Sequence, residues 1–600
     1  MIDKKFIKIW KVLEAKHKRQ IFFLIIISLT ASLTDLIGIV SILPFLSVLI
    51  NPELIETNRI ILFIKSELDL NNKDLTIFFG LVTLFSLFIN QTMKVLSQYY
   101  KDYVFENYFK ETSFKVFNYY LSQSYSNYLV SSSANMFQKI LVGMHNIIVG
   151  YIGPVFAIFQ NLFTTLIIIF FLLLYEPAVT LIISFFLAAF YLLLFKKIKN
   201  KIGDLGKIVP SFFSSSSKVI TDAFGSFKEI KINNNKNFFL SNYLDKLKLY
   251  TGANIKINLY SYIPSALIEV FLFGLILVVA VFIAGKFESL YHLIPLLGLL
   301  AMALKRIMPS MFQIYTNMIQ IKYNSAYFDQ LFGDYYNASI TYSSMGAKKK
   351  IIERSLEKKI NFHNVSYQFQ NAKSKSLSKI NTQIRKGEFI GVAGESGSGK
   401  TTFIDLLLGL LKPNSGKIMY DNNNLAINRN QILNIKGIGY APQRGYLLDS
   451  SIGANVAFGK FNYKKVKRAC EIAEISSFIE KNLKKSYNTI IGENGVRLSG
   501  GQIQRIIIAR AIYNHPELII MDEATNSLDS NTEKKIFNNI KKNFKSSTRI
   551  LITHRLNTLK YCDKIILISN KKIEAEGSFK ELKKNNKKFN LLLNTYNKNN

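Results

Sequence analysis

Long apolar segments constrain this chain more than any other feature of its sequence. A helix that spans a membrane needs about 20 mostly apolar residues. Six segments before residue 325 meet that length: 21–50, 75–97, 148–175, 178–196, 262–285 and 289–321. The sequence therefore predicts a membrane domain of six helices. Because 600 residues exceed what one hydrophobic core can organise, at least one further domain is expected.

Lysines between the apolar segments predict the orientation of the helices. The N-terminus and the connections 98–147 and 196–261 are rich in lysine, as cytoplasmic loops are. Both chain ends are therefore expected in the cytoplasm. The two long connections can continue membrane helices into the cytosol, with coupling turns near Tyr125–Ser133 and Ala223–Lys231 that could touch a cytosolic domain. In the external connection, Asn58–Asp69 is either an amphipathic interfacial helix or an ordinary loop helix.

The formal charge of +36 raises the question of nucleic-acid binding. The basic residues are spread along the chain, and positive loops beside apolar segments use the same charge, so we expect no nucleic-acid partner. Cys470 and Cys562 have no metal-binding spacing and indicate a reducing cytosol for the second half. No small-residue cleavage site follows the first apolar run, so no cleavable signal peptide is expected.

A phosphate-binding motif marks the second half of the chain. The sequence GESGSGKTT follows a strand-like segment at Glu388–Ala393 and precedes a helical segment at Phe403–Leu411, which is the context that a P-loop requires. Lys400 is expected at the β- and γ-phosphates, and Thr401 at Mg²⁺. The predicted phosphate site comprises Gly394, Glu395, Ser396, Gly397, Ser398, Gly399, Lys400, Thr401 and Thr402.

Two carboxylates end an apolar strand further along the chain. Asp522 suits a Mg²⁺ shell, and Glu523 suits a base that polarises water for attack on the γ-phosphate. Between these motifs, LSGGQ at residues 498–502 opens a helix, whose N-terminus is either a second phosphate site or simply capped. The combination resembles the ATP-binding cassette (ABC) family.

The resemblance assigns roles to further residues between 360 and 585. It implies that Phe369, or the nearby Tyr367, stacks on adenine, and that Gln443 senses Mg²⁺ and the membrane domain. It also implies that His554 contacts the γ-phosphate, and it places Asp529 in the D-loop. The expected catalytic residues are therefore Glu523, His554 and Gln443, and the expected Mg²⁺ ligands are Thr401, Gln443 and Asp522. Nucleotide contacts are also expected from Phe369, Leu498, Ser499, Gly500, Gly501, Gln502 and Asp529.

One P-loop and one LSGGQ occur in the chain, and in this family the signature of one cassette closes the ATP site of the other. The resemblance therefore implies a homodimer with two composite sites, using ATP and Mg²⁺. The expected fold is an α-helical six-span membrane domain of the ABC exporter type, followed by an α/β P-loop cassette. The expected limits are residues 1–340, a linker at 341–358, and residues 359–600.

Two patches of the membrane domain concern the substrate. The first apolar segment carries Asp35 ahead of a Pro-Phe pair, and the sixth carries LKRIMPS with Lys305 beside Arg306. With FGSFKEIKI in the second coupling turn, they resemble the lipid-linked oligosaccharide flippase branch, although Asp35 stands where that branch has Glu. This implies ATP-driven translocation of a polyprenyl-pyrophosphate-linked oligosaccharide, or a similar glycolipid, across a bacterial inner membrane, with membrane lipids as further partners.

Arg306 has two interpretations. A guanidinium that faces a transient cavity could bind the pyrophosphate through paired hydrogen bonds. Adjacent residues of a helix point about 100° apart, so Lys305 would then snorkel or pair elsewhere. Alternatively, both cations pair with carboxylates such as Asp35 or Glu269 and fix helix packing.

Other functions compete with a glycolipid flippase. An ABC exporter of lipids or amphipathic drugs would share the architecture. A soluble ABC protein acting on ribosomes or DNA is opposed by the six expected spans, and a non-hydrolysing receptor by the presence of Glu523 and His554. No peptidase domain precedes the first apolar segment, which argues against a processing peptide exporter.

Overall fold

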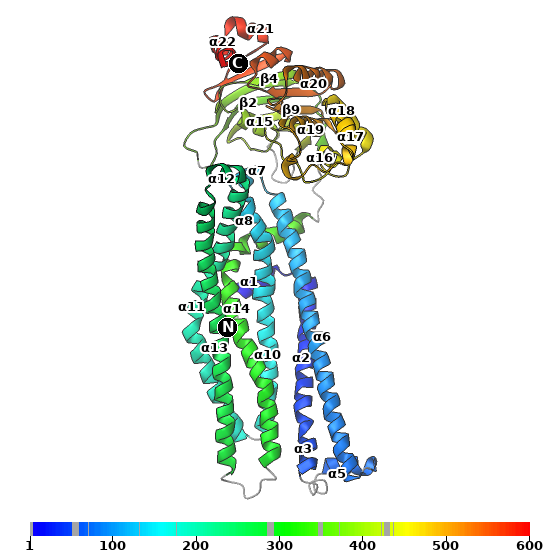
Figure 1. The fold of residues 1–600 in the computed structure, drawn as a ribbon, viewed down its shortest axis with the longest axis vertical. Coiled ribbons are helices and arrows are strands. Elements are labelled where there is room, and N and C mark those ends of the chain that lie inside the picture. Colours follow the sequence, from blue (N-terminus) through cyan, green and yellow to red (C-terminus); the bar gives the residue numbers. More distant parts are fainter. Residues whose placement is uncertain are drawn as a thin grey trace. The chain divides into compact units, whose positions relative to one another are not determined.

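The computed structural model describes residues 4–50, 59–69, 71–130, 132–175, 177–284, 293–345, 352–370, 372–421, 423–424, 433–435 and 437–599. The chain forms two compact units (Figure 1). The first contains residues 1–123 and 128–346, and the second contains residues 124–127 and 347–600. The boundary between residues 346 and 347 falls inside the segment expected as a linker; part of that segment, residues 346–351, lies outside the described residues.

The described residues of the first unit form long helices with short connections (Figure 1). The helical elements up to residue 345 are α1 Lys4–Val12, α2 Ala15–Val40, α3 Ile42–Ile50, α5 Arg59–Glu67, α6 Asn72–Leu121, α7 Tyr125–Val130, α8 Ser133–Gln138, η1 Lys139–Gly143, α9 Met144–Ile147, η2 Ile148–Ile152, α10 Gly153–Tyr175, α11 Pro177–Gly225, α12 Phe227–Asn233, α13 Lys236–Ala284 and α14 Leu293–Met345.

Three helical segments among the described residues are long and apolar enough to cross a membrane: Ala15–Leu46, Asn72–Leu121 and Ser133–Tyr175. They contain most of the first three expected spans. The first of these is not one helix, because α2 ends at Val40 and α3 begins at Ile42. The segments expected at 178–196, 262–285 and 289–321 fall within or overlap α11, α13 and α14, whose side chains are described only in part. The count of six spans therefore stays a prediction.

The two lysine-rich connections continue helices, as the sequence predicts. Helix α6 extends to Leu121, and α11 extends to Gly225, far beyond the apolar part of each. The chain reverses direction beside two short helices, α7 and α12. These helices lie at the positions expected for the coupling turns. Residues 124–127 belong to the second unit, where Tyr125 packs against a buried hydrophobic cluster. The helix expected at residues 58–69 is present as α5, while its external position stays a prediction.

Helices of the first unit approach one another closely where one of them carries glycine. A Cβ atom on Gly206 of α11 would lie 2.6 Å from the Tyr323 carbonyl oxygen of α14. The continuous helix from residue 133 to 175 contains two π turns, η1 and η2, and there it also packs against α14. The Asn324 side chain of α14 donates to the Gly150 carbonyl oxygen of η2 at 2.8 Å. A Cβ atom on Gly150 would lie 2.7 Å from that amide nitrogen.

The second unit is built on two larger sheets (Figure 1). One has the order β12-β11-β4-β10-β9-β8 and is parallel except for β12; the other, β3-β2-β5-β6, is antiparallel. Strands β1 and β7 form a parallel pair. The strands are β1 Ile352–Arg354, β2 Lys359–Tyr367, β3 Leu377–Arg385, β4 Phe389–Ala393, β5 Ser415–Tyr420, β6 Asn423–Asn424, β7 Leu433–Ile435, β8 Ile438–Ala441, β9 Leu518–Asp522, β10 Thr548–Ile552, β11 Lys564–Ser569 and β12 Lys572–Gly577.

Helices pack on these sheets and bury two hydrophobic clusters. Every residue of β4, β9 and β10 is buried, as expected for parallel strands covered on both faces. The helical elements are α15 Lys400–Leu407, α16 Ile452–Ala457, α17 Tyr463–Ile472, α18 Ser476–Asn482, η3 Ser486–Asn488, η4 Glu493–Gly495, α19 Gly500–Ile512, α20 Ser530–Asn543, η5 Leu556–Tyr561, α21 Phe579–Asn585 and α22 Lys587–Asn599.

Candidate nucleotide-binding and catalytic site

The carboxyl ends of four adjacent strands gather the predicted catalytic residues. Strands β4, β10, β9 and β8 are neighbours in the sheet and run parallel, so the segments that follow them emerge at one edge. The P-loop follows β4, His554 follows β10, Glu523 follows β9, and Gln443 follows β8. Ligands of open α/β sheets bind at this edge. Residues that are far apart in the sequence are thereby brought together.

The P-loop has the geometry of a phosphate cradle. Gly399 caps the N-terminus of α15 and has φ of 108°. Gly394 has φ of 156°, and a Cβ atom added to it would lie 2.2 Å from the Ile568 carbonyl oxygen. Neither position accepts a side chain, which lets a phosphate approach the backbone of the loop closely. Among the described residues, the buried Ser398 hydroxyl oxygen has no hydrogen-bond partner, which suits a phosphate oxygen.

Lys400 lies over its own loop. Its Nζ atom donates to the carbonyl oxygens of Gly394 at 2.8 Å and Glu395 at 2.9 Å. Burial lowers the pKa of Lys400, although the carboxylates of Glu523 and Asp522 act in the opposite direction. A bound phosphate would supply the counter-charge that this amine lacks. Of the remaining loop residues, Glu395, Ser396, Gly397 and Thr401 are exposed and Thr402 is buried.

Glu523 is the centre of a hydrogen-bonded cluster. The His554 Nε2 atom lies 2.6 Å from Glu523 Oε1. The side-chain amide of Gln443 donates to Oε2, and the amide of Asn526 donates to the same oxygen at 3.0 Å. The carboxylate is buried whereas the His554 ring is half exposed, so the cluster opens toward solvent on the histidine side. The three predicted catalytic residues therefore lie in direct contact.

Asp522 lies beside this cluster at the end of β9. Burial raises the pKa of Asp522, and the neighbouring charge of Glu523 raises it further. The Tyr440 hydroxyl donates to Asp522 Oδ2 at 3.3 Å. A divalent cation would offset the cost of two adjacent carboxylates, and oxygen ligands are what Mg²⁺ prefers. Asp522 therefore fits a Mg²⁺ ion at this edge, and the exposed Thr401, in the first turn of α15, stays the predicted second ligand.

The signature segment begins a helix and is capped by its own residues. Ser499 accepts from the Gln502 backbone N–H, while the Gln502 side chain accepts from the Ser499 N–H. Leu498 is half-buried, and the exposed Gly500 begins α19 together with Gly501. This is the capped helix that the sequence left open as an alternative, and a capped N-terminus still presents backbone donors and a positive dipole end.

The other two predicted nucleotide contacts differ in their surroundings. Tyr367 is 7% exposed, whereas Phe369 is half-buried and packs edge-on against the Tyr367 ring, with ring centres 5.0 Å apart. Phe369 therefore has the more accessible ring for stacking. Asp529 caps α20, because its carboxylate accepts from the Thr532 N–H at 2.9 Å. Its observed contact is structural.

A charge cluster in the membrane unit brings together residues of three helices. The Arg306 Nη1 atom of α14 lies 3.1 Å from Asp35 Oδ1 of α2, and the Lys94 Nζ atom of α6 lies 2.8 Å from the same oxygen. Asn90 of α6 also donates to it, at 2.7 Å. The Asp35 side chain is 5% exposed. Arg306 thus has the partner that the packing interpretation gives it, while Lys305 is exposed.

Comparison with known proteins covers both units. Residues 21–289 match the family described as ABC transporter transmembrane region, and residues 377–526 match the family described as ABC transporter. The fold is similar to that of a bacterial Atm1-family ABC exporter with ATP bound, with a TM-score of 0.72 and 18% identity, over 96% of this chain and 98% of that chain. Both domains match ABC transporter families, and the fold is that of an ABC exporter. The helical membrane domain and α/β cassette confirm the predicted fold class.

Curated relatives match the chain over a shorter region. The leukotoxin translocation ATP-binding protein LktB of Pasteurella haemolytica-like sp. (strain 5943B) is 39% identical over 229 residues, which are 38% of this chain and 32% of the relative. The alpha-hemolysin translocation ATP-binding protein HlyB of Escherichia coli is 40% identical over 225 residues, 37% of this chain and 32% of the relative. The matches thus span about a third of each relative's length. Both relatives are named as ATP-binding translocation proteins, and the matches leave the substrate of this chain open.

Some site residues were not predicted from the sequence. Asn526, three residues before Asp529, was not among the predicted site residues, yet its side-chain amide donates to Glu523. Lys94 was not predicted as a member of the charge cluster. Its position near the end of an apolar segment, four residues after Asn90, was a signal that could have identified it. Its contact with Asp35 depends on how α2 and α6 pack.

Proposed function

We propose that the transporter hydrolyses ATP, as a homodimer with two composite sites, to move an amphipathic substrate outward across a bacterial inner membrane. The observation that carries the proposal is the convergence of Lys400, Asp522, Glu523, Gln443 and His554 at the ends of four parallel strands. The exposed LSGGQ segment supports the dimer, because a helix N-terminus at the surface can complete a phosphate site of another copy.

Each residue of the cluster has a chemical task in hydrolysis. The P-loop N–H groups and Lys400 hold the phosphates, and Glu523 accepts hydrogen bonds from an attacking water and orients it. His554 and Gln443 fix the Glu523 carboxylate in place and can exchange that contact for the γ-phosphate and the water. Mg²⁺, when bound with ATP, neutralises the charge that develops on the phosphates.

For the substrate we propose a polyprenyl-pyrophosphate-linked oligosaccharide or a similar glycolipid. Arg306 and Lys94 share one carboxylate, so the cluster around Asp35 has an excess of one positive charge in the membrane unit. An anionic pyrophosphate linkage that enters the membrane loses hydration, and a fixed positive charge would offset part of that loss. Arg306 could therefore pair with Asp35 and still attract the substrate.

Reconstitution in liposomes tests the substrate class. The full chain would be supplied with lipid-linked oligosaccharides of different glycan and polyprenyl length, with phospholipids, with amphipathic drugs, or with unfolded polypeptide. The expected result is that only the pyrophosphate-linked glycolipids stimulate ATP hydrolysis and appear in the outer leaflet. Stimulation by drugs or simple lipids alone would identify the alternative exporter class. Stimulation by polypeptide alone would place the substrate with those of the toxin translocators.

A further inference from the structure

A large apolar cavity lies between the N-terminal helix and the first membrane segments. Its volume is about 510 Å³, within the range of about 300–1,000 Å³ that ligand pockets have. Ile7 and Trp10 of α1 line one side, and Ile25 and Leu29 of α2 and Phe159 of α10 line others. The cavity is far from the nucleotide site in sequence and lies in the other unit.

Helix α1 is firmly attached by its other face. Ile9 and Leu13 are buried in the largest hydrophobic cluster of the membrane unit. Lys5 forms an ion pair with Asp329 of α14, with Nζ 2.7 Å from the carboxylate. Because this face is occupied, Ile7 and Trp10 remain directed toward the cavity, where they are 49% and 37% exposed. The helix therefore forms a fixed wall of the cavity.

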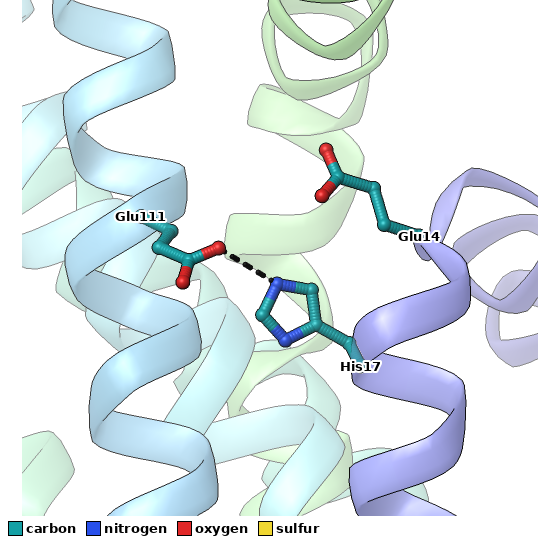
Figure 2. Close-up of side chains that lie close together, drawn as sticks. All are labelled: Glu14, His17 and Glu111. Carbon is teal, nitrogen blue, oxygen red and sulfur yellow. Dashed lines mark hydrogen bonds and ion pairs between the residues drawn. The ribbon is translucent and has the colours of Figure 1, made fainter.

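The corner between α1 and α2 is held by a second set of contacts (Figure 2). His17 Nε2 lies 3.0 Å from Glu111 of α6, and Glu14 approaches the same ring. The ligand atoms of Glu14, His17 and Glu111 lie within 4.8 Å of one another, a spacing that could suit a metal ion. However, Lys16 pairs with Glu111 and Lys115 with Glu14, so lysines already neutralise both carboxylates. The group serves as a clamp that fixes α1 over the cavity.

The surroundings of the cavity are strongly basic. Residues 4–19 contain seven lysines and arginines and one glutamate. The Lys18 Nζ atom lies 5.9 Å from the centre of the Trp10 ring, and so stands beside the cavity wall. A basic amphipathic helix next to a membrane segment is typical of an element that lies in the headgroup region and attracts anionic lipids. The cavity thus combines an apolar interior with a cation at its edge.

We propose that this cavity binds one acyl chain of an anionic phospholipid from the cytoplasmic leaflet, with Lys18 close to its phosphate. The lipid is a resident ligand rather than the transported substrate, and its binding does not depend on which substrate is moved. An acyl chain fits because the lining is apolar. An anionic headgroup fits because Lys18, unlike Lys5 and Lys16, forms no ion pair with a carboxylate of the described residues.

The sequence supplies a direct probe of the cavity, because Trp10 is the one tryptophan of the 600-residue chain. The full-length protein in detergent would be titrated with phosphatidylglycerol that carries bromine on its acyl chain, which quenches tryptophan fluorescence on contact. Quenching should saturate at about one lipid per chain. With brominated phosphatidylcholine, half-saturation of the quenching should require a lipid concentration about fivefold higher. The same increase is expected when the Lys18→Gln variant is titrated with brominated phosphatidylglycerol.

Two neighbouring isoleucines provide matched variants. Ile25 lines the cavity and is 40% exposed, whereas Ile26 is 41% exposed and is not part of the lining. Ile25→Phe should fill the cavity and weaken the saturable quenching about tenfold, while Ile26→Phe should leave it unchanged. Equal melting temperatures and basal ATP hydrolysis in the two variants would show that both are folded.

Three results would overturn the proposal. Quenching that rises without saturation, and equally in both variants, would mean that Trp10 only touches the bulk lipid or detergent surface. Quenching that favours phosphatidylcholine would exclude an anionic headgroup. Lack of quenching at all lipid concentrations would show that something else covers the cavity. If quenching then appeared when the protein was diluted to monomers, the cover would be a second copy of the chain.

Discussion

Glu523 has a left-handed backbone conformation, with φ of 51°, directly after the last residue of β9. Such a conformation costs a non-glycine residue about 1–3 kcal/mol and persists where neighbouring contacts hold it. The Glu523 N–H donates to the Ile552 carbonyl oxygen at 2.9 Å, and its side chain accepts from His554, Gln443 and Asn526. These contacts hold the Glu523 backbone and carboxylate in place directly after the strand.

The Glu523→Gln variant should therefore separate nucleotide binding from turnover. An amide keeps the size of the side chain but cannot take a proton from water, so ATP hydrolysis should fall by at least about 100-fold. ATP binding, measured by equilibrium binding of a fluorescent analogue, should be kept because Lys400 and Thr401 are unchanged. Lys400→Ala is the contrasting variant and should weaken binding itself. Wild-type hydrolysis by Glu523→Gln would mean that another group is the base.

The carboxyl group of Asp405 in α15 should make the stability of the folded cassette depend on pH. Burial, with a contribution from the charge of Asp522, raises the pKa of Asp405 from 3.8 to about 6. The ionised form is thus disfavoured in the folded cassette, so stability falls as the pH rises from about 4 to about 6 and stays lower above that. Asp405→Asn should raise the free energy of unfolding at pH 7.5 by about 1 kcal/mol, after allowance for solvent screening, and change little at pH 4. Thermal melting at the two pH values measures this, and an equal effect at both would contradict the ionisation argument.

Asp35 should matter more for stability than either of its cations. Asp35→Asn leaves Arg306 and Lys94 facing each other without a counter-charge, at a cost of about 3–5 kcal/mol. Arg306→Ala leaves Lys94 and Asn90 on the carboxylate, so it should cost about 1 kcal/mol while glycolipid transport in liposomes falls. Lys305→Ala, at the exposed neighbouring position, is the control. Normal transport by a stable Arg306→Ala protein would remove Arg306 from the substrate path.

The residue-level site could be predicted from the sequence only where a motif is local. The P-loop, LSGGQ and the pair Asp522–Glu523 are each contiguous, and so their chemistry is readable from spacing. The contact of Lys94 with Asp35 joins two helices, and that of Asn526 with Glu523 depends on the turn after β9. Such contacts require the packed structure, because sequence spacing does not give the distance between side chains of different elements.

Among the helices, close crossings at glycine give an element-scale prediction. Gly206→Ala places a Cβ atom 2.6 Å from a backbone oxygen of α14, which cannot move away as a side chain could, so it should destabilise the membrane unit by about 1–3 kcal/mol. Gly252 of α13 has open space at its Cβ position, and Gly252→Ala should be neutral or stabilising by about 0.5–1 kcal/mol. Melting of the detergent-solubilised protein measures both. Equal melting temperatures would refute the crossing argument.

At the scale of elements, apolar length predicted where helices lie but not where they are interrupted. The expected span at 21–50 contains a break at Ser41, shortly before Pro44, and this proline itself lies inside α3. The span expected at 148–175 continues a helix that begins at residue 133, as the predicted cytosolic extension allows, but its two π turns were not predicted. The π turns lie where this helix packs on α14, and a period of apolar residues does not reveal such contacts.

The homodimer proposal makes a prediction for the whole molecule. Lys400→Ala damages the P-loop and Ser499→Arg damages the signature, so a homodimer of either variant has two damaged composite sites. A mixed dimer has both lesions in one site and an intact second site. Co-expressed variants with different tags, purified through both tags, should therefore regain part of the ATP hydrolysis that each homodimer lacks. A mixed dimer no more active than the homodimers would contradict the shared-site arrangement.

The two π turns of η1 and η2 also determine which way the rest of their helix faces. A π turn contains one residue more than an α turn, and each residue of an α-helix adds about 100° of rotation. If the same residues formed regular α turns instead, the two extra residues would rotate every side chain of α10 by about 200°, and the surface that now packs on α2 and α14 would point elsewhere. Residues 139–152 thus determine the direction in which the side chains of the next 23 residues point.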